Sequence, residues 1–226
     1  MKHFIDIDQF SKLELRKILI KAKQIKKNKN KNLLFFKNIS LGLLFEKQST
    51  RTRLSFSIGM QKLGGNVIEL DANQIGFGIR ESENDILKVM SQYIDILMVR
   101  NHNHEKMKNL ASKNHIPIIN GLSNFSHPCQ ILSDIFTIEE HLGAIKGKTI
   151  VWLGDANNVL ISLIQAAELF KFKLNILTPK SLINKINKIF KDQELNYSYF
   201  YNNINKGMNE ADCVMTDTWF SMGDIV

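Results

Sequence analysis

The chain has 226 residues, of which 44% are hydrophobic and 23% charged, a composition typical of a folded globular protein rather than a disordered or fibrous one. No apolar run approaches the roughly 20 residues of a membrane-spanning helix, and the N-terminus lacks the apolar core of a secretion signal, so we expect a cytoplasmic protein without a membrane segment. The formal net charge is +8, but much of the excess lies within residues 21–31 without any nucleic-acid-binding motif, which argues against nucleic acid as a partner.

In the first part of the chain, apolar residues recur with the spacings of alternating helices and strands. Helical spacing predicts a helix over about 11–25, a second from Arg51 to a stop at Gly64 and Gly65, and two more helices over 83–93 and 130–142. Short apolar runs predict strands at 41–45, 66–70, 94–100 and 116–120. Strands that alternate with helices favour a parallel sheet covered on both faces.

A second series of alternating elements begins after a break at residues 142–148. The pattern predicts helices at 159–170, 182–190 and 204–210, and strands at 149–153, 174–178, 197–201 and 213–216. We therefore expect an α/β protein of two domains, residues 1–142 and 143–226, each a mostly parallel sheet flanked by helices.

The first polar cluster lies between a predicted strand and a predicted helix, where parallel sheets bind their ligands. The backbone N–H groups of Thr50, Arg51 and Thr52 can converge on an anion at the helix N-terminus, with Ser49 as the N-cap residue. Arg51 and Arg53 add guanidinium groups suited to phosphate or carboxylate oxygens. A helix start with solvated arginines is the alternative interpretation of this cluster.

Two further clusters follow the next strands of the first series. Arg100 ends one strand, and His-Pro-Cys-Gln at 127–130 lies just beyond the next. Arg100 and His127 are donors suited to a carbonyl oxygen, and Gln130 offers both a donor and an acceptor. A histidine before a proline is usually structural when it stands alone.

The second series carries two more clusters at strand ends. Gly-Asp-Ala-Asn-Asn at 154–158 lacks the glycine spacing of a dinucleotide site, and an ordinary strand-to-helix turn explains it equally well. In residues 217–223, Asp217 is suited to an ammonium group and Ser221 to a carboxylate or an amine. A plain loop is the alternative for this segment.

Taken together, these motifs resemble those of one family. Phe-Glu-Lys-Gln-Ser-Thr-Arg-Thr-Arg at 45–53 resembles the phosphate-binding signature of the aspartate and ornithine carbamoyltransferases, and His-Pro-Cys-Gln resembles their second signature. The Ser-Met-Gly that follows Asp217 resembles the amino-acid-binding loop of the ornithine branch, where the aspartate branch carries arginines for a second carboxylate. The resemblance covers essentially the whole chain, and its first signature is highly specific.

The resemblance implies transfer of the carbamoyl group of carbamoyl phosphate to the δ-amine of ornithine, which gives citrulline and phosphate in arginine metabolism. The catalytic residues that it implies are Arg51, Arg100, His127 and Gln130. The residues that it implies for substrate binding are Ser49, Thr50, Arg51, Thr52, Gln74, Arg100, His127, Gln130, Asn158, Asp217, Ser221 and Met222. Gln74 matches a loop that reaches a neighbouring subunit's site in this family, so a homotrimer with shared sites follows by analogy.

The implied chemistry requires no metal or organic cofactor. The sequence shows no metal-ligand cluster, and its two cysteines, Cys129 and Cys213, are far apart without metal-ligand spacing. The attacking amine must be neutral, and deprotonating an amine like that of lysine at pH 7 costs about 4–5 kcal/mol, so the site must lower the amine's pKa.

The family pattern continues beyond the Ser-Met-Gly loop with further strands, a His-Cys-Leu-Pro motif and a terminal helix, whereas this sequence stops at Val226. We therefore expect a second domain that is incomplete at its C-terminus, and weak catalysis or none from the chain as written. Three alternatives stay open. They are carbamoyl transfer to a related amine such as a modified ornithine or putrescine, non-catalytic binding of carbamoyl phosphate, and regulation of a full-length enzyme.

Overall fold

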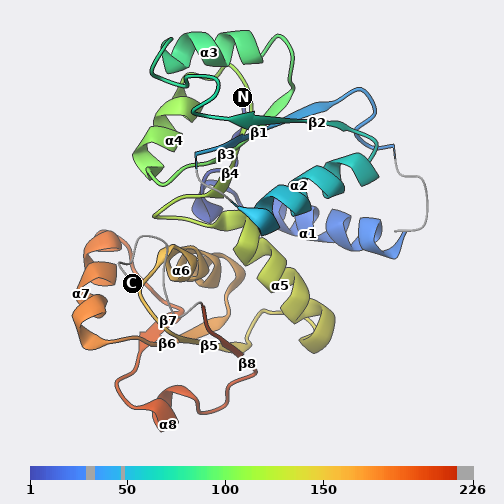
Figure 1. The fold of residues 1–226 in the computed structure, drawn as a ribbon. Helices are drawn as coiled ribbons and strands as arrows, with labels where there is room; N and C mark the ends of the chain where they lie inside the picture. The colour runs from blue at the N-terminus through green and yellow to red at the C-terminus, as the bar shows by residue number, and fades with distance from the viewer. Residues whose placement is uncertain (29–33, 47–48, 218–226) are drawn as a thin grey trace. The chain divides into compact units, whose positions relative to one another are not determined.

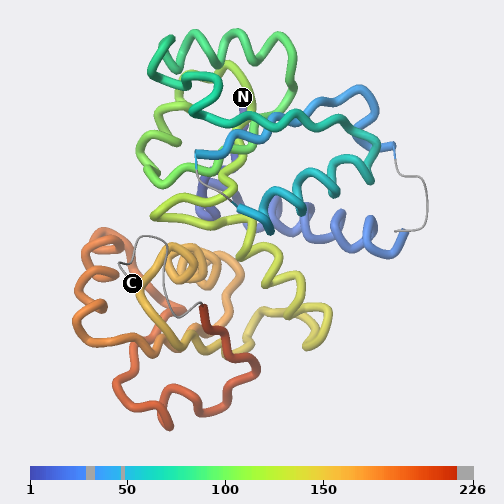
Figure 2. Tube along the Cα trace, in the orientation of Figure 1, coloured from blue at the N-terminus to red at the C-terminus, as the bar shows by residue number. Residues whose placement is uncertain are grey.

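A computed structural model describes residues 1–28, 34–46 and 49–217 of the chain (Figure 1). The chain divides into two units: the first comprises Met1–Asp6 and Arg16–Asn124, and the second comprises Ile7–Leu15 and the residues from Phe125 onward. The Cα trace in Figure 2 shows the order of the elements, from blue at the N-terminus to red at the C-terminus.

The first unit contains a sheet of four parallel strands in the order β2-β1-β3-β4. Its strands are β1 (Ser40–Phe45), β2 (Asn66–Asp71), β3 (Ile96–Arg100) and β4 (Ile118–Leu122). The helices that follow its strands are α2 (Thr50–Lys62), α3 (Glu83–Met90) and α4 (His104–Ser112). The longer α1 (Lys12–Lys27) begins in residues of the second unit and continues into the first.

The central strands β1 and β3 are buried on both faces, as expected of a parallel sheet with helices on each side. Successive side chains along a strand point to opposite faces, so Leu43 and Leu44 belong to two different hydrophobic clusters. The Leu44 cluster includes Ile86 and Leu87 of α3 and Met107 and Leu110 of α4. The Leu43 cluster includes Met60 of α2. Both clusters therefore fix the helices that start at the carboxyl edge of the sheet.

The second unit contains another sheet of four parallel strands, in the order β7-β6-β5-β8. Its strands are β5 (Thr149–Leu153), β6 (Lys173–Leu177), β7 (Ser198–Phe200) and β8 (Cys213–Met215). Its helices are η1 (Ile7–Gln9), α5 (Pro128–Leu142), α6 (Asn158–Phe170), α7 (Lys180–Ile189) and α8 (Ile204–Gly207). The chain order reverses between β5 and β8, and such a reversal opens a crevice at the carboxyl ends of the strands.

The α/β class with parallel sheets flanked by helices is confirmed. The sequence pattern missed α4, because His104–Ser112 is largely polar and its apolar stripe consists of only Met107, Leu110 and Ala111. It also missed the short η1 helix, and it extended α3 by three residues into a turn that precedes β3. The division at residues 142 and 143 stays a prediction. In the part of the chain that the structure describes, no helix is both long and apolar enough to span a membrane.

Candidate active site

The predicted phosphate-binding cluster forms the first turn of α2, directly beyond the carboxyl end of β1. Ser49 occupies the N-cap position with extended backbone angles (φ −157°, ψ 116°), and its side chain makes no capping hydrogen bond to the helix. The N–H groups of the first turn, those of Thr50, Arg51 and Thr52, have no carbonyl within the helix to bond. The turn therefore presents backbone donors, a hydroxyl and the exposed side chain of Arg51 to an anion.

Arg53, the second arginine of the cluster, has a different environment. Its Nη1 lies 3.2 Å from Glu69 Oε2 on the neighbouring strand β2, and its guanidinium lies 4.9 Å from the centre of the Phe45 ring. These contacts bind Arg53 to the sheet itself. Arg51, by contrast, has an exposed side chain in the first turn of α2, and its predicted contact with an anion stays a prediction.

Arg100 and Thr52 are brought together by the sheet, although 48 residues separate them. Arg100 ends β3 beside Phe45, the last residue of β1, and its Nη1 donates a hydrogen bond of 2.9 Å to Thr52 Oγ1. Burial lowers the pKa of the Arg100 guanidinium, which nevertheless stays charged at neutral pH. The first unit thus places a half-buried cation against the first turn of α2.

Glu46 directly follows β1 at this edge of the sheet. Its N–H donates to the Arg100 carbonyl at 3.1 Å, and its Oε1 accepts a hydrogen bond from Lys106 Nζ at 3.0 Å. Lys106 also pairs with Glu83 at 3.1 Å. Burial lowers the pKa of Lys106, but its hydrogen bonds to the two glutamates outweigh this effect and the net pKa is raised. These contacts hold the segment after β1 against the end of β3, where Arg100 lies, and against Lys106 of α4.

Gln74 lies in the turn after β2, where its side chain is exposed. Asp71 organises this turn, because its Oδ1 accepts hydrogen bonds from the backbone N–H groups of Asn73 and Gln74. An exposed position suits the predicted contact with another subunit, which stays a prediction.

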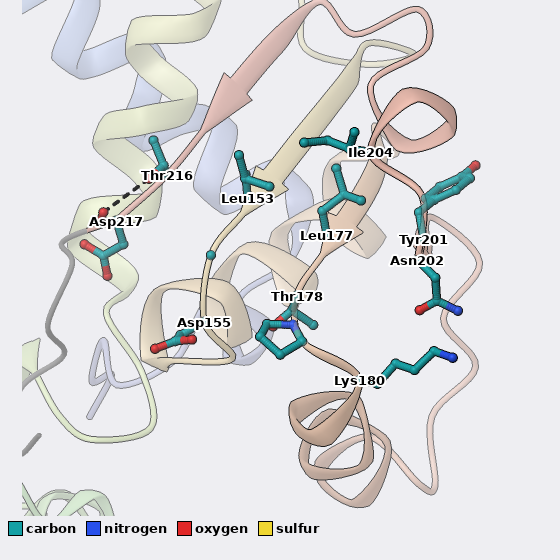
Figure 3. A pocket seen from close by; sticks show the side chains of 12 residues that line it. Leu153, Asp155, Leu177, Thr178, Lys180, Tyr201, Asn202, Ile204, Thr216 and Asp217 are labelled. Carbon is teal, nitrogen blue, oxygen red and sulfur yellow. Dashed lines mark hydrogen bonds between the residues drawn. The ribbon is translucent and has the colours of Figure 1, made fainter.

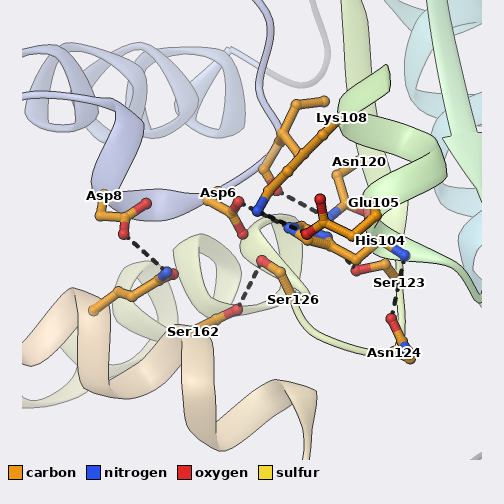
Figure 4. Close-up of polar contacts among 12 residues, drawn as sticks. Asp6, Asp8, His104, Glu105, Lys108, Asn120, Ser123, Asn124, Ser126 and Ser162 are labelled. Atoms are coloured by element: carbon orange, nitrogen blue, oxygen red, sulfur yellow. Dashed lines mark hydrogen bonds and ion pairs between the residues drawn. The ribbon is translucent and has the colours of Figure 1, made fainter. Parts of the chain in front are cut away.

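In the second unit, His127 is the N-cap residue of α5 and Pro128 is the first helical residue. The His127 N–H donates to Ser162 Oγ of α6 at 2.9 Å, and Ser162 Oγ lies 3.1 Å from Ser126 Oγ (Figure 4). This contact holds the start of α5, and Gln130 follows in its first turn. Arg100 belongs to the first unit and His127 to the second, so the predicted pairing of these two donors stays a prediction.

The turn at residues 154–158 contacts Asp217 through a residue that the sequence reasoning missed. Asn157, the N-cap residue of α6, accepts from the N–H groups of Val159 and Leu160, and its Nδ2 donates to Asp217 Oδ2. The predicted Asn158 is the next residue, at the first position of α6. An asparagine directly before an apolar helix is a recognisable capping signal, so the capping role of Asn157 could have been predicted from the sequence. Ser221 and Met222 lie outside the described residues.

Asp134 is a second missed residue, one turn after Gln130 on α5. Burial raises the pKa of its carboxyl to about 6, a hydrogen bond from Gln130 lowers it, and the charge of Asp217 raises it. Its Oδ2 is buried without a hydrogen-bond partner among the described residues. These effects place Gln130, Asp134 and Asp217 in one electrostatic neighbourhood, where both carboxylates favour a positively charged ligand.

A pocket of about 890 Å³ opens at the carboxyl ends of β5, β6, β7 and β8 (Figure 3). This is the edge at which the chain order reverses and where a sheet of this kind binds ligands. Its lining includes Leu153, Leu177, Ile204, Asp155, Lys180 and Asp217. Within the described parts of the chain, no group of three or more histidine, cysteine and acidic side chains is arranged to hold a metal ion.

Solved structures share this architecture, which is that of the two-domain α/β carbamoyltransferases. The ornithine carbamoyltransferase of Burkholderia thailandensis superposes with a TM-score of 0.89 at 34% identity, over 97% of this chain and 76% of that one. The ornithine carbamoyltransferase of Pyrococcus furiosus superposes with a TM-score of 0.88 at 33% identity, over 98% of this chain and 73% of that one.

Sequence comparisons define the family more narrowly. Residues 2–140 match the carbamoyl-P binding domain of aspartate/ornithine carbamoyltransferases, and residues 146–225 match the Asp/Orn binding domain. The chain is 42% identical to the ornithine carbamoyltransferase of Nitrobacter winogradskyi and 43% identical to that of Rhodopseudomonas palustris, over 99% of its own length and 74% and 73% of theirs. The chain belongs to the aspartate/ornithine carbamoyltransferase family.

Proposed function

We propose that the protein transfers the carbamoyl group of carbamoyl phosphate to the δ-amine of ornithine, with citrulline and phosphate as products. The observation that carries the proposal is the 2.9 Å hydrogen bond from Arg100 to Thr52, which sets a guanidinium beside the anion-binding turn of α2. The match of both chain segments to the family, and the ornithine carbamoyltransferases among its relatives, support the same reaction.

The donor half of the reaction needs cations where negative charge develops. Phosphate bound by residues 49–52 gains charge as it departs, and Arg51 with the N–H groups of the first turn stabilises that charge. Addition to the carbamoyl carbon places negative charge on its oxygen, which Arg100 and His127 stabilise as donors. Gln130 binds the carbamoyl amide in this scheme.

The acceptor half uses the carboxylates of the second unit. We assign Asp217 to the α-ammonium of ornithine, because it lines the pocket and Asn157 holds one of its oxygens. Asn158, Ser221 and Met222 complete the proposed ornithine contacts. The δ-amine must lose its proton before it attacks, at a cost of about 4–5 kcal/mol if its pKa is that of a lysine, so closure of the site around both substrates is part of the proposal.

Further parts of the proposal follow the sequence expectations. Residues 1–142 bind the donor and residues 143–226 bind the acceptor. Gln74 reaches the site of a neighbouring copy in a homotrimer. The protein acts in the cytoplasm in arginine biosynthesis or breakdown.

The test combines binding with product formation. We expect calorimetry to detect carbamoyl phosphate binding to the full chain, and Arg51→Ala to abolish it. Arg80→Ala removes an exposed arginine elsewhere in the first unit and serves as the matched control. Undiminished affinity in Arg51→Ala would count against the phosphate site.

Citrulline formation from carbamoyl phosphate and ornithine tests the transfer step itself. A panel of acceptors that includes putrescine and modified ornithines identifies the amine. Binding of carbamoyl phosphate without product from any acceptor would replace the proposed transfer with a binding or regulatory role.

A further inference from the structure

Arg100 lies at an irregularity of the sheet. The pairing register between β3 and β4 shifts between Val99 and Arg100, so that Arg100 pairs with Leu122 although Val99 pairs with Asn120. Such a bulge turns the side chains beside it to a new direction, and bulges are common next to active sites. The direction of the Arg100 guanidinium therefore depends on whatever holds this bulge in place.

The segment after the bulge is bonded to the segment after β4 along its length. The Asn101 N–H donates to the Leu122 carbonyl at 3.2 Å, and the Asn124 N–H donates to the His102 carbonyl at 2.9 Å. The His104 N–H then donates to Asn124 Oδ1 at 3.2 Å. Residues 101–104 and 122–124 thus form one hydrogen-bonded unit that continues the pairing beyond the bulge.

The ring of His104 joins this unit from within the core of the first unit (Figure 4). Its Nδ1 lies 2.8 Å from Ser123 Oγ and its Nε2 lies 3.1 Å from Asp6 Oδ2. The three residues are almost fully buried, with exposed fractions of 4% for His104, 0% for Ser123 and 4% for Asp6. A carboxylate only accepts hydrogen bonds, so Nε2 carries a hydrogen, and in the neutral ring Nδ1 accepts from the serine hydroxyl.

Both partners of the ring stand at points where the chain leaves the first unit. Asp6 is the last residue before the passage to Ile7, and Ser123 is followed by Asn124, the last residue before the passage to Phe125. A buried histidine bonded at both nitrogens allows little freedom to either segment, because moving one of them would break a hydrogen bond between buried groups.

We propose that His104 is a positioning residue for the carbamoyl-transfer site: it holds the bulge that aims Arg100 at the carbamoyl oxygen. It acts through Ser123 and the residue 122–124 segment and touches no substrate. The inference rests on the proposed function, because Arg100 has this target only if carbamoyl phosphate binds beside Thr52.

The test compares two stable ligands by calorimetry on the full chain. Phosphonoacetamide carries the phosphonate and the carbonyl amide, whereas methylphosphonate carries the phosphonate alone. The ratio of the affinity for phosphonoacetamide to that for methylphosphonate measures the contact between the carbonyl amide and Arg100. A general loss of phosphate binding weakens both ligands equally and leaves this ratio unchanged. Thermal unfolding of each variant establishes that it is folded.

We expect His104→Ala to lower this ratio by about tenfold, the loss of one charge-assisted hydrogen bond. His102→Ala, which removes an exposed histidine from the same turn, should leave the ratio unchanged. His104→Asn places an amide where Nδ1 was and should recover the ratio through Ser123. His104→Gln reaches Asp6 instead and should not recover it.

An unchanged ratio in folded His104→Ala overturns the inference, and so does an equal loss in His102→Ala or recovery by glutamine rather than asparagine. If the alanine variant does not fold, the asparagine and glutamine variants decide the question in the same way. Wild-type chain that binds neither ligand refutes the proposed function instead, and the inference falls with it.

Discussion

Asp134→Asn should stabilise the folded protein at neutral and alkaline pH. Burial raises the pKa of this carboxyl from an ordinary 3.8 to about 6, against the lowering effect of Gln130. Keeping the group ionised in the folded state therefore costs up to about 3 kcal/mol relative to the unfolded chain. Asparagine retains the shape and a polar group for Gln130 but carries no charge to bury, so the variant avoids this cost.

The sign of the effect depends on pH. Because the folded protein binds the proton more tightly than the unfolded chain does, Asp134 contributes most to stability below about pH 4. The contribution is lost as pH rises toward and through about 6. The free energies of unfolding of Asp134→Asn and wild type should therefore differ most at pH 8 and converge near pH 4.

Urea unfolding at pH 4, 6 and 8 measures these free energies. Asp192→Asn is the matched control, because it makes the same substitution at a side chain that is 84% exposed. Equal stability of Asp134→Asn and wild type at pH 8 would refute the reasoning, as would a difference of the same size in Asp192→Asn.

Three other substitutions test the core, a helix cap and the donor site. Leu43→Ala should lower the free energy of unfolding, measured in urea, by about 2–5 kcal/mol. Leu54→Ala is the control, because Leu54 is 56% exposed and its loss should change this free energy little. Equal losses in the two variants would contradict the assignment of the core. Asn157→Ala should lower it by about 0.5–2 kcal/mol through the lost cap of α6, and an unchanged melting temperature would argue against that role. Thr52→Val removes the hydroxyl that accepts from Arg100 and should weaken carbamoyl phosphate binding, measured by calorimetry, about tenfold. Unchanged affinity would contradict this role of Thr52.

Much of the fold was predictable because its signals are local. The run Leu41–Phe45 is apolar at every position except Gly42, and a strand buried on both faces requires such a run. The glycine pair at 64 and 65 ended the predicted helix near the observed end of α2. By contrast α4 was missed, because a short polar helix is stabilised by the few side chains that it packs against the sheet.

The candidate site was predictable to a similar degree and for the same reason. The helix start at Thr50 could be recognised from the order strand, Ser49, helix, since those residues are neighbours in the chain. The contact between Asn157 and Asp217 could not be foreseen, because it joins residues that are 60 positions apart. Arg53 was grouped with Arg51, and only its contact with Glu69 on β2 separates them.

The sequence by itself determined most of the elements, their order and the residue types at the strand ends, since spacing and turn chemistry act over a few residues. Only the tertiary structure decided which of those residues meet. Thr52 and Arg100 are 48 residues apart, and His104 and Asp6 are 98 apart. Parallel pairing of the strands brings such residues to one edge of the sheet, and this pairing follows from burying both faces of the sheet rather than from any local pattern.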